Sequence, residues 1–404
     1  MLSLTEARAL LLQGVLPVGR ETMPIHAGSG RILAADVCAA RDQPPAALSA
    51  MDGYAVRAHD AKAGALLPVV GEAPAGAPFV GHLGAGEAVR IATGGVVPSG
   101  ADTIIIQENV VRDGPGIRIV EAPAAEAFIR AAGCDFAAGA RIASAGETLT
   151  PARLALIAAV NLASVEVHAR PRVAIFPSGD ELREPGTPLR PGEIVNSAAY
   201  AIEALVESWG GIASRRPILP DDPDACEAAL LDGGFTADVL VTLGGASVGD
   251  RDSLRPIFAK LGADIVFDRI AVQPGKPTWH ARFPGGPLLL GLPGNPASGF
   301  VCAQLLLKPL LFALSGRDWE TAVRLLPATL AADLPANGAR ETFVRASAAV
   351  DREGGLRVAP MQRQDSSLLM PLAAANALIR RLPAAPVAVS GDRVEFVPMC
   401  LADI

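Results

Sequence analysis

Between residues 171 and 315, short uninterrupted apolar runs alternate with segments of helical periodicity. The runs at 172–176, at the positions leading to Leu243 and at 287–292 each indicate a buried strand. Helical patterns follow at 253–261 and from Pro296 through Leu311. This alternation predicts a parallel sheet with helices on both faces. The loops at the carboxyl ends of such strands meet in one crevice, where ligands bind.

The flanking regions have other patterns. Residues 1–20 have the spacing of an amphipathic helix with Thr5 as its candidate N-cap, and residues 25–37 are expected to be extended. A small β domain is predicted from short runs separated by Gly and Pro, at 68–70, 88–92, 103–107 and 116–120. A helix is predicted at 151–162, with Pro151 in its first turn. A second β module is predicted from runs at 342–346, 356–359 and 393–398.

Composition narrows the class of protein. The chain has 404 residues, enough for about two to four domains, and is 50% hydrophobic and 19% charged, as globular chains are. A net charge of −7 argues against nucleic acid as a partner, because phosphate backbones require clustered Lys and Arg. The five cysteines are scattered, as reduced thiols in the cytoplasm are, and the five histidines show no zinc-ligand spacing.

No secretory signal or membrane span is expected. Glu6 and Arg8 place charges where a signal peptide needs an apolar core. The most apolar stretch, 288–314, is interrupted by Pro293, Asn295, Pro296, Lys308 and Pro309. These features predict a cytoplasmic protein.

The turn after Leu243 has the composition of a ligand-binding loop. It is rich in glycine and acid, at Gly244, Gly245, Ser247, Gly249, Asp250 and Asp252. Backbone N–H groups in such a strand–helix turn bind anions. Carboxylates beside a bound anion would repel it unless a divalent cation lies between them. The turn therefore predicts a phosphate-bearing ligand held with a metal. The loops after the other two strands repeat the arrangement, with Pro177-Ser178-Gly179-Asp180-Glu181 and Pro293-Gly294-Asn295-Pro296.

A second interpretation of this turn is the nucleophile elbow of an α/β-hydrolase. Residues 245–249 match the Gly-x-Ser-x-Gly pattern, with Ser247 as the nucleophile. His280 is the only histidine downstream that could complete a triad. Labelling of Ser247 by a fluorophosphonate would distinguish this alternative.

A series of short motifs resembles the molybdopterin molybdenumtransferases, the family that includes the C-terminal domain of gephyrin. The first is Ser49-Ala50-Met51-Asp52-Gly53-Tyr54-Ala55-Val56. The others follow in the family's order at 91–94, 98–102, 178–182, 244–252, 274–277, 291–296, 364–366 and 375–376. Each motif is weak alone, but the ordered combination covers nearly the whole chain and is specific.

The resemblance implies an α/β multidomain fold with a central parallel-sheet domain of molybdopterin-binding type at 171–318. Around it the family pattern places an N-terminal helix packing on that domain (1–20), a linker or dimerisation domain (21–50 and 139–170), a β-rich insertion domain (51–138) and a C-terminal β-barrel-like domain (319–404). It also implies a homodimer, in which Asp52 and the C-terminal module of the other subunit complete the crevice.

The resemblance further implies a reaction: insertion of molybdenum from molybdate into adenylylated molybdopterin, with release of AMP. Molybdate and adenylylated molybdopterin are then substrates, and Mg²⁺ is the expected cofactor, held by Glu181 and Asp252. Cleavage of a phosphate anhydride needs charge neutralisation, for which a carboxylate-held Mg²⁺ is suited. The expected protein partners are a molybdopterin adenylyltransferase and molybdoenzymes.

Site residues are transferred by motif position. The catalytic candidates are Asp52, Asp135, Glu181, Asp221, Asp252 and Lys276. The cofactor-binding candidates are Thr93, Ser178, Gly179, Asp180, Gly244, Gly245, Ser247, Gly249, Arg269, Pro293, Gly294, Asn295, Arg340, Arg345 and Ser366. The alternative for each acid is a solvated carboxylate or a helix cap, and for Arg340 and Arg345 a plain salt bridge.

Some positions depart from the family pattern. Gln273 stands before Pro-Gly-Lys where relatives usually carry Lys or Arg, and a neutral amide supplies no point charge for an oxyanion. Cys134 replaces a usual Glu, and Asp365 replaces a usual Gly. These changes leave open a catalytically impaired paralogue that carries molybdopterin without turnover.

Overall fold

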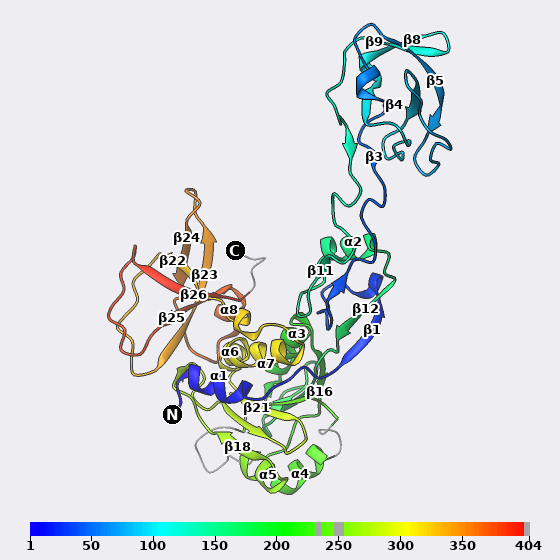
Figure 1. Cartoon of the computed structure of the whole chain (residues 1–404). Coiled ribbons are helices and arrows are strands. Elements are labelled where there is room, and N and C mark those ends of the chain that lie inside the picture. Colours follow the sequence, from blue (N-terminus) through cyan, green and yellow to red (C-terminus); the bar gives the residue numbers. More distant parts are fainter. Residues whose placement is uncertain (232–235, 246–253, 400–404) are drawn as a thin grey trace.

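The computed structural model describes residues 1–231, 236–245 and 254–399. Figure 1 shows an elongated molecule in which an α/β domain and a C-terminal β barrel lie together at one end. A long β-rich arm extends away from them. The predicted multidomain α/β fold class is confirmed.

The α/β domain is built on one six-stranded sheet in the order β16-β13-β17-β21-β20-β18. Its strands are β13 (Arg172–Pro177), β16 (Ile212–Arg215), β17 (Val239–Leu243), β18 (Asp264–Phe267), β20 (Trp279–Arg282) and β21 (Leu288–Leu292). The first four in the sheet order are parallel, whereas β20 and β18 run antiparallel to their neighbours. The predicted parallel strands are present, and the two antiparallel strands at this edge were not predicted from the sequence. The connection from β20 to β21, residues 283–287, is too short for the crossover that parallel neighbours need.

Helices cover both faces of the sheet, as predicted. One face carries α1 (Leu4–Leu12), α3 (Ala198–Ser208), α6 (Pro296–Cys302) and α7 (Lys308–Leu314), and the other carries α4 (Pro223–Leu231) and α5 (Leu254–Lys260). Val173 and Ile175 of β13 belong to the first core, and Ala174 and Phe176 belong to the second. Because side chains alternate between two buried faces, the parallel strands are apolar without interruption.

A single long helix spans Pro296–Leu314, in which a π-helical turn, η4 (Ala303–Leu307), joins α6 to α7. The expected interruption at Lys308 and Pro309 is therefore wrong. Pro309 has no N–H for the carbonyl of Leu305, and Arg8 of α1 donates to that carbonyl instead, at 3.3 and 3.2 Å. The helix is long and apolar enough to cross a membrane, but 78% of its apolar stretch is buried inside the protein, as in a core helix.

The N-terminal helix differs from the prediction. Ser3, not Thr5, is the N-cap: Ser3 Oγ accepts the Glu6 N–H at 3.2 Å, and the Glu6 carboxylate accepts the Ser3 N–H at 2.8 Å. The expected extended segment at 25–37 is wrong at its start, where η1 is a 3₁₀ turn. The short 3₁₀ helices are η1 (Ile25–Ala27), η2 (Ala58–Asp60), η3 (Gln107–Asn109) and η5 (Trp319–Ala322).

The arm has a linker beside the α/β domain and a β domain at its far end (Figure 1). The antiparallel pairs of the linker are β1 (Arg20–Pro24) with β12 (Ser164–His168), β2 (Val37–Cys38) with β11 (Arg141–Ala143), and β3 (Leu48–Ser49) with β10 (Ile129–Arg130). Helix α2 (Pro151–Ala159) packs in the linker core and is capped by Thr150. The far sheet has the order β7-β4-β6-β5-β9-β8, with β4 (Gly53–Val56), β5 (Leu66–Ala73), β6 (Ala88–Ile91), β7 (Thr103–Ile106), β8 (Val110–Asp113) and β9 (Gly116–Ile119).

The C-terminal domain is a closed barrel. Its strands are β22 (Leu326–Leu330), β23 (Glu341–Val350), β24 (Leu356–Pro360), β25 (Ala377–Arg381) and β26 (Arg393–Pro398). They pair around a ring, β23-β24-β22-β26-β25, which closes because β25 pairs back with β23. A further strand, β19 (Val272–Gln273), pairs in parallel with the start of β23. Because β19 lies in the chain between β18 and β20 of the central sheet, this ladder joins the barrel to the α/β domain.

Two short elements lie beside the carboxyl edge of the central sheet. β14 (Leu182–Arg183) pairs in parallel with β15 (Ile194–Val195), and α8 (Leu369–Ala373) contacts α6. These elements bring the segment after β13 and the end of a barrel loop close to the same edge.

Candidate functional site

A cavity of about 890 Å³ lies at the carboxyl ends of the parallel strands. The loops after β13, β17 and β21 all line it, with Ser178, Gly179, Glu181, Gly244, Gly245, Pro293, Gly294 and Asn295. In the chain, β13 is followed by β16 on one side of it and then by β17 on the other. The loops after β13 and β17 therefore diverge, and open α/β sheets bind ligands at such a switch point.

Close approach of the backbone explains two of the glycines in this cavity. Gly244 has a φ of +95°, and a Cβ there would lie 2.6 Å from the carbonyl oxygen of Ser178. A Cβ on Gly294 would lie 3.2 Å from the Cα of Gly244. The three loops therefore pack backbone against backbone, which keeps the floor of the cavity free of side chains.

One hydroxyl in the cavity wall lacks a partner. Ser178 is 5% exposed, and its Oγ has no hydrogen-bond partner among the described residues. Its backbone N–H already donates to the carbonyl of Leu243 at 2.9 Å. An unpaired buried hydroxyl costs about 1–3 kcal/mol, which a ligand that hydrogen-bonds to it would recover.

Two carboxylates share the cavity, those of Glu181 and Asp221. Asp180 does not line it: its Oδ1 accepts the backbone N–H of Asp221 at 3.1 Å and so holds the backbone that presents the Asp221 side chain. The predicted residues Ser247, Gly249 and Asp252 lie outside the described residues. Within the described ranges, no group of three or more His, Cys, Asp or Glu is placed to hold a metal by itself.

The segment that carries Glu181 is anchored by residues that sequence analysis missed. Glu184 accepts hydrogen bonds from Asn196 Nδ2 and from the Tyr200 hydroxyl, both at 2.9 Å. Asn196 is 3% exposed and lines the cavity at the start of α3. The available signal was a polar pair, Asn-Ser, directly before a helical pattern.

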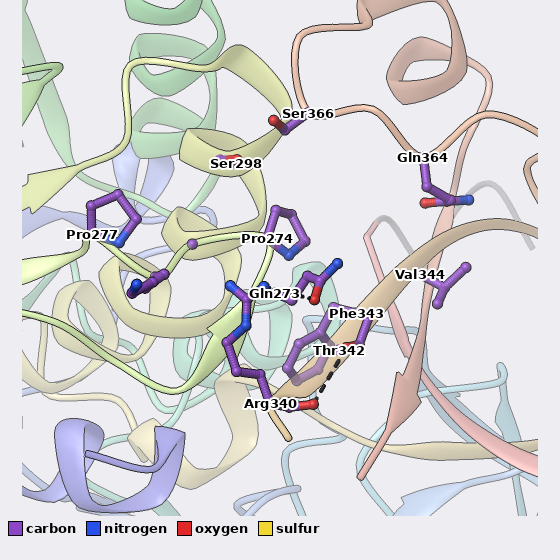
Figure 2. Close-up of a pocket in the computed structure, with 12 residues that line it drawn as sticks. Gln273, Pro274, Pro277, Ser298, Arg340, Thr342, Phe343, Val344, Gln364 and Ser366 are labelled. Carbon is purple, nitrogen blue, oxygen red and sulfur yellow. Dashed lines mark hydrogen bonds between the residues drawn. The ribbon is translucent and has the colours of Figure 1, made fainter. Parts of the chain in front are cut away.

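A second pocket of about 280 Å³ adjoins the first (Figure 2). Pro277 lines both cavities, and Asn295 of the larger one donates from Nδ2 to Ser366 Oγ of the smaller one at 3.1 Å. The smaller pocket lies between domains: Lys276 comes from the α/β domain, and Arg340 comes from the barrel. None of the described residues that line it is acidic, so the pocket favours anions.

Neither cation of the smaller pocket is neutralised by a described carboxylate. Arg340 donates from Nη2 to Gln273 Oε1 at 2.9 Å and from Nη1 to the Val272 carbonyl at 3.5 Å. Lys276 is exposed and forms no ion pair with any residue that the structure describes. Both charges are therefore available to a bound anion.

Gly275 shapes the loop that carries Lys276. Its φ is +130°, and a Cβ there would lie well under 3.0 Å from Cys302 Sγ. Thr278 Oγ1 donates to the Gly275 carbonyl at 2.8 Å. Burial raises the pKa of the Cys302 thiol to about 12, so a neutral thiol packs under the loop. Sequence analysis quoted this loop but did not identify Thr278 or Cys302 as its support.

Family models match most of the chain. They are the MoeA N-terminal region (domain I and II) over residues 2–161, a probable molybdopterin binding domain over 174–313 and the MoeA C-terminal region (domain IV) over 327–399. A molybdopterin molybdenumtransferase from Haemophilus influenzae is 32% identical over 382 residues, which are 94% of each chain. This chain belongs to the MoeA family of molybdopterin molybdenumtransferases.

Other comparisons agree with this MoeA assignment. A molybdopterin molybdenumtransferase from Nostoc is 38% identical over 333 residues, which are 80% of this chain and 76% of the relative. A crystal structure of a molybdopterin biosynthesis MoeA protein from Pyrococcus horikoshii has a TM-score of 0.86 at 29% identity and covers 99% of both chains. The resemblance noted in the sequence is therefore confirmed.

Three predicted residues of this MoeA chain lie in the arm, away from both cavities of the same chain. They are Asp52, Thr93 and Asp135. Asp52 Oδ1 accepts the Thr93 N–H at 2.6 Å and the Thr93 hydroxyl at 3.0 Å. The Thr93 N–H, followed by its hydroxyl, holds the pKa of Asp52 below its usual value. Asp135 is exposed, and its backbone N–H donates to the Gln43 carbonyl at 3.0 Å.

Two predicted arginines line neither cavity. Arg345 is 1% exposed and donates to the carbonyls of Leu368 and Asp365, at 3.1 and 2.8 Å, so it supports the loop that carries Ser366. Arg269 is exposed and forms an ion pair with Asp268 at 2.7 Å. In this MoeA chain the barrel that supplies Arg340 and Ser366 is the chain's own. The expectation that the C-terminal module of another subunit completes the crevice stays a prediction.

The hydrolase alternative is not favoured for this MoeA chain. His280 is fully buried on β20, its Nδ1 donates to the Leu289 carbonyl at 2.7 Å, and its Nε2 accepts from Arg282 Nε at 3.2 Å. Burial lowers the pKa of His280 to about 4. With both ring nitrogens engaged, this histidine cannot serve as the base for Ser247.

Proposed function

We propose that this protein inserts molybdenum from molybdate into adenylylated molybdopterin, with release of AMP, in molybdenum cofactor biosynthesis. The observation that carries the proposal is the pair of adjoining cavities that share Pro277. The larger has the volume of a site for a nucleotide-sized ligand, about 300–1,000 Å³. The smaller cavity is lined by two cations and is large enough for an oxyanion such as molybdate. A transfer between a nucleotide-linked pterin and an oxyanion requires the two reactants to be held side by side.

In the larger cavity, Ser178 and Asn295 are the proposed polar contacts to the nucleotide–pterin. The unpaired Ser178 hydroxyl supports this role, and Asn295 links the ligand to the smaller pocket through Ser366. In the smaller pocket, Lys276 and Arg340 are proposed to hold molybdate, because two cations match the charge of a dianion.

The residues present also fit Mg²⁺. This ion binds hard oxygen ligands and usually takes one or two carboxylates together with substrate phosphates. Glu181 and Asp221 both line the larger cavity and supply such a pair, and Asp252 is the further candidate outside the described residues. When bound, Mg²⁺ would supply charge neutralisation at the phosphate oxygens. The carboxylates themselves would orient the phosphate group through the ion that they hold.

We further propose a homodimer in which Asp52 and Thr93 reach the cavities of the second subunit. The support is their position on an arm that points away from the cavities of their own chain. Mixing the variants Asp52→Ala and Lys276→Ala tests this arrangement. Each variant alone should be inactive. Subunit exchange at equal concentrations should restore roughly a quarter of the wild-type activity, because about half of the dimers are then mixed and each mixed dimer has one of its two sites intact. No recovery after demonstrated exchange would contradict a shared site.

The proposed activity itself is tested by incubating the pure protein with adenylylated molybdopterin, molybdate and Mg²⁺. AMP and a cofactor that activates an apo-molybdoenzyme are the expected products. Binding of adenylylated molybdopterin without release of AMP would instead support a carrier, the alternative raised by Gln273.

A further inference from the structure

We propose that Gln273 is a positioning residue that holds Arg340 in the smaller pocket and thereby determines the affinity of that pocket for molybdate. The inference rests on the proposed function of the pocket. It extends that function by assigning a role to a neutral side chain that cannot itself supply a charge to an oxyanion.

The contacts of Arg340 support this role. Its guanidinium has two described hydrogen-bond acceptors, and both belong to β19: Gln273 Oε1 at 2.9 Å and the Val272 carbonyl at 3.5 Å. The second contact is at the limit of a hydrogen bond, so the Gln273 amide is the stronger constraint. Figure 2 shows the two side chains next to each other in the pocket wall. Without Gln273, a long arginine side chain would sample several rotamers.

The backbone brings the pair together. Gln273 is the last residue of β19, and it pairs with Thr342 of β23, two residues after Arg340. The hydrogen bond therefore crosses from the α/β domain to the barrel along an existing ladder. This places a barrel cation in the same pocket as Lys276.

The neutral acceptor matters for the charge of the pocket. A carboxylate at 273 would also orient Arg340, but it would neutralise its charge, and a lysine there would repel it. An amide oxygen accepts the guanidinium N–H and leaves the positive charge in place. The pocket thus keeps two cations for one dianion.

The test measures AMP release and compares three constants: the KM for molybdate, the KM for adenylylated molybdopterin and kcat. Gln273→Ala should raise the KM for molybdate roughly 3- to 10-fold, the value of one hydrogen bond, and leave kcat and the KM for adenylylated molybdopterin unchanged. Gln273→Glu should raise it further, because the acceptor is kept but the charge is lost. Gln13→Ala, an exposed glutamine at the end of α1, is the matched control and should change nothing.

A double-mutant cycle with Arg340→Ala decides the mechanism. If Gln273 acts through Arg340, adding Gln273→Ala to the Arg340→Ala variant should produce no further increase in KM. The proposal is overturned if the Gln273→Ala effect persists in that background, or if Gln273→Ala lowers kcat and the unfolding midpoint instead. Arg118→Ala, on β9 in the arm, controls for the loss of one positive charge.

Equilibrium dialysis with molybdate alone distinguishes failure of this role from failure of the proposed function. The wild type should bind molybdate more tightly than Gln273→Ala even in a preparation that releases no AMP. Equal binding by the two proteins, with normal AMP release, would overturn the role of Gln273 and leave the proposed function intact.

Discussion

The variant Gly275→Ala tests how the loop between Lys276 and Gln273 is held in place. Gly275 adopts a φ of +130°, and an added Cβ would lie well under 3.0 Å from the Sγ of Cys302. The thiol cannot move aside, because Cys302 is fully buried in helix α6 and belongs to the main core. The loop must therefore shift away from the helix, and Lys276 must shift with it.

Two separate penalties set the size of the effect. An alanine at this positive φ costs about 1–3 kcal/mol of backbone strain. Forcing a methyl group into a packed core costs about 1–3 kcal/mol more. Gly275→Ala should therefore lower the free energy of unfolding by about 2–6 kcal/mol. Cys302→Ala alone removes one buried atom and should cost about 1 kcal/mol.

The double variant Gly275→Ala/Cys302→Ala separates the two penalties. The new methyl group occupies the space left by the sulfur, so the overpacking cost disappears and the backbone strain remains. Its destabilisation should be smaller than the sum of the single variants by about 1–3 kcal/mol. Urea unfolding followed by tryptophan fluorescence measures this, because Trp209 and Trp279 are buried in the α/β domain. Additive destabilisation in the double variant would refute the steric argument.

Three further results are expected. Glu181→Gln should lower AMP release about 100-fold and raise the Mg²⁺ concentration required, because a proposed ligand is lost; an unchanged Mg²⁺ titration would count against that role. His280 has a native pKa of about 4, below its usual 6.5. The free energy of unfolding should therefore be unaffected by His280 above pH 6.5 and should fall by up to about 3 kcal/mol as the pH drops toward 4, because only the unfolded chain protonates this residue. Urea midpoints measured across this range should fall with pH more steeply for the wild type than for His280→Gln. Cys302, with a thiol pKa of about 12, should resist iodoacetamide at pH 8 while the exposed Cys134 reacts, as peptide mass spectrometry would show; equal labelling would contradict the burial of Cys302.

Local sequence signals were sufficient for much of the fold. The second predicted run ends at Leu243, as β17 does, and the predicted strand at 393–398 coincides with β26. Continuous apolar runs and alternation depend only on neighbouring residues, which explains this agreement. The cap of α1 was also readable, because Ser3 has Glu6 three positions later, whereas Thr5 has no such partner.

Features that depend on distant residues were not predicted. Strand β20 contains His280 and Arg282, and its burial is possible because Leu289 of the next strand accepts the histidine N–H. Pro309 stays in a helix because Arg8, far away in sequence, satisfies the carbonyl that it leaves free. The hydrogen bond between Gln273 and Arg340 requires the ladder between β19 and β23, and no local sequence pattern predicts that pairing. The glycine loops were located from sequence, and so were Lys276, Arg340 and Ser366 of the second pocket; the contact that holds Arg340 was not.

The ladder between β19 and β23 has a consequence for how the two reactants are handled. It joins the walls of the cationic pocket within one polypeptide, so a single chain forms this pocket. The carboxylate of Asp52, by contrast, is carried on an arm joined to the rest only through the linker. The affinity for molybdate should therefore be the same at nanomolar and micromolar protein. Turnover should decline on dilution if the proposed homodimer supplies Asp52 from a second subunit.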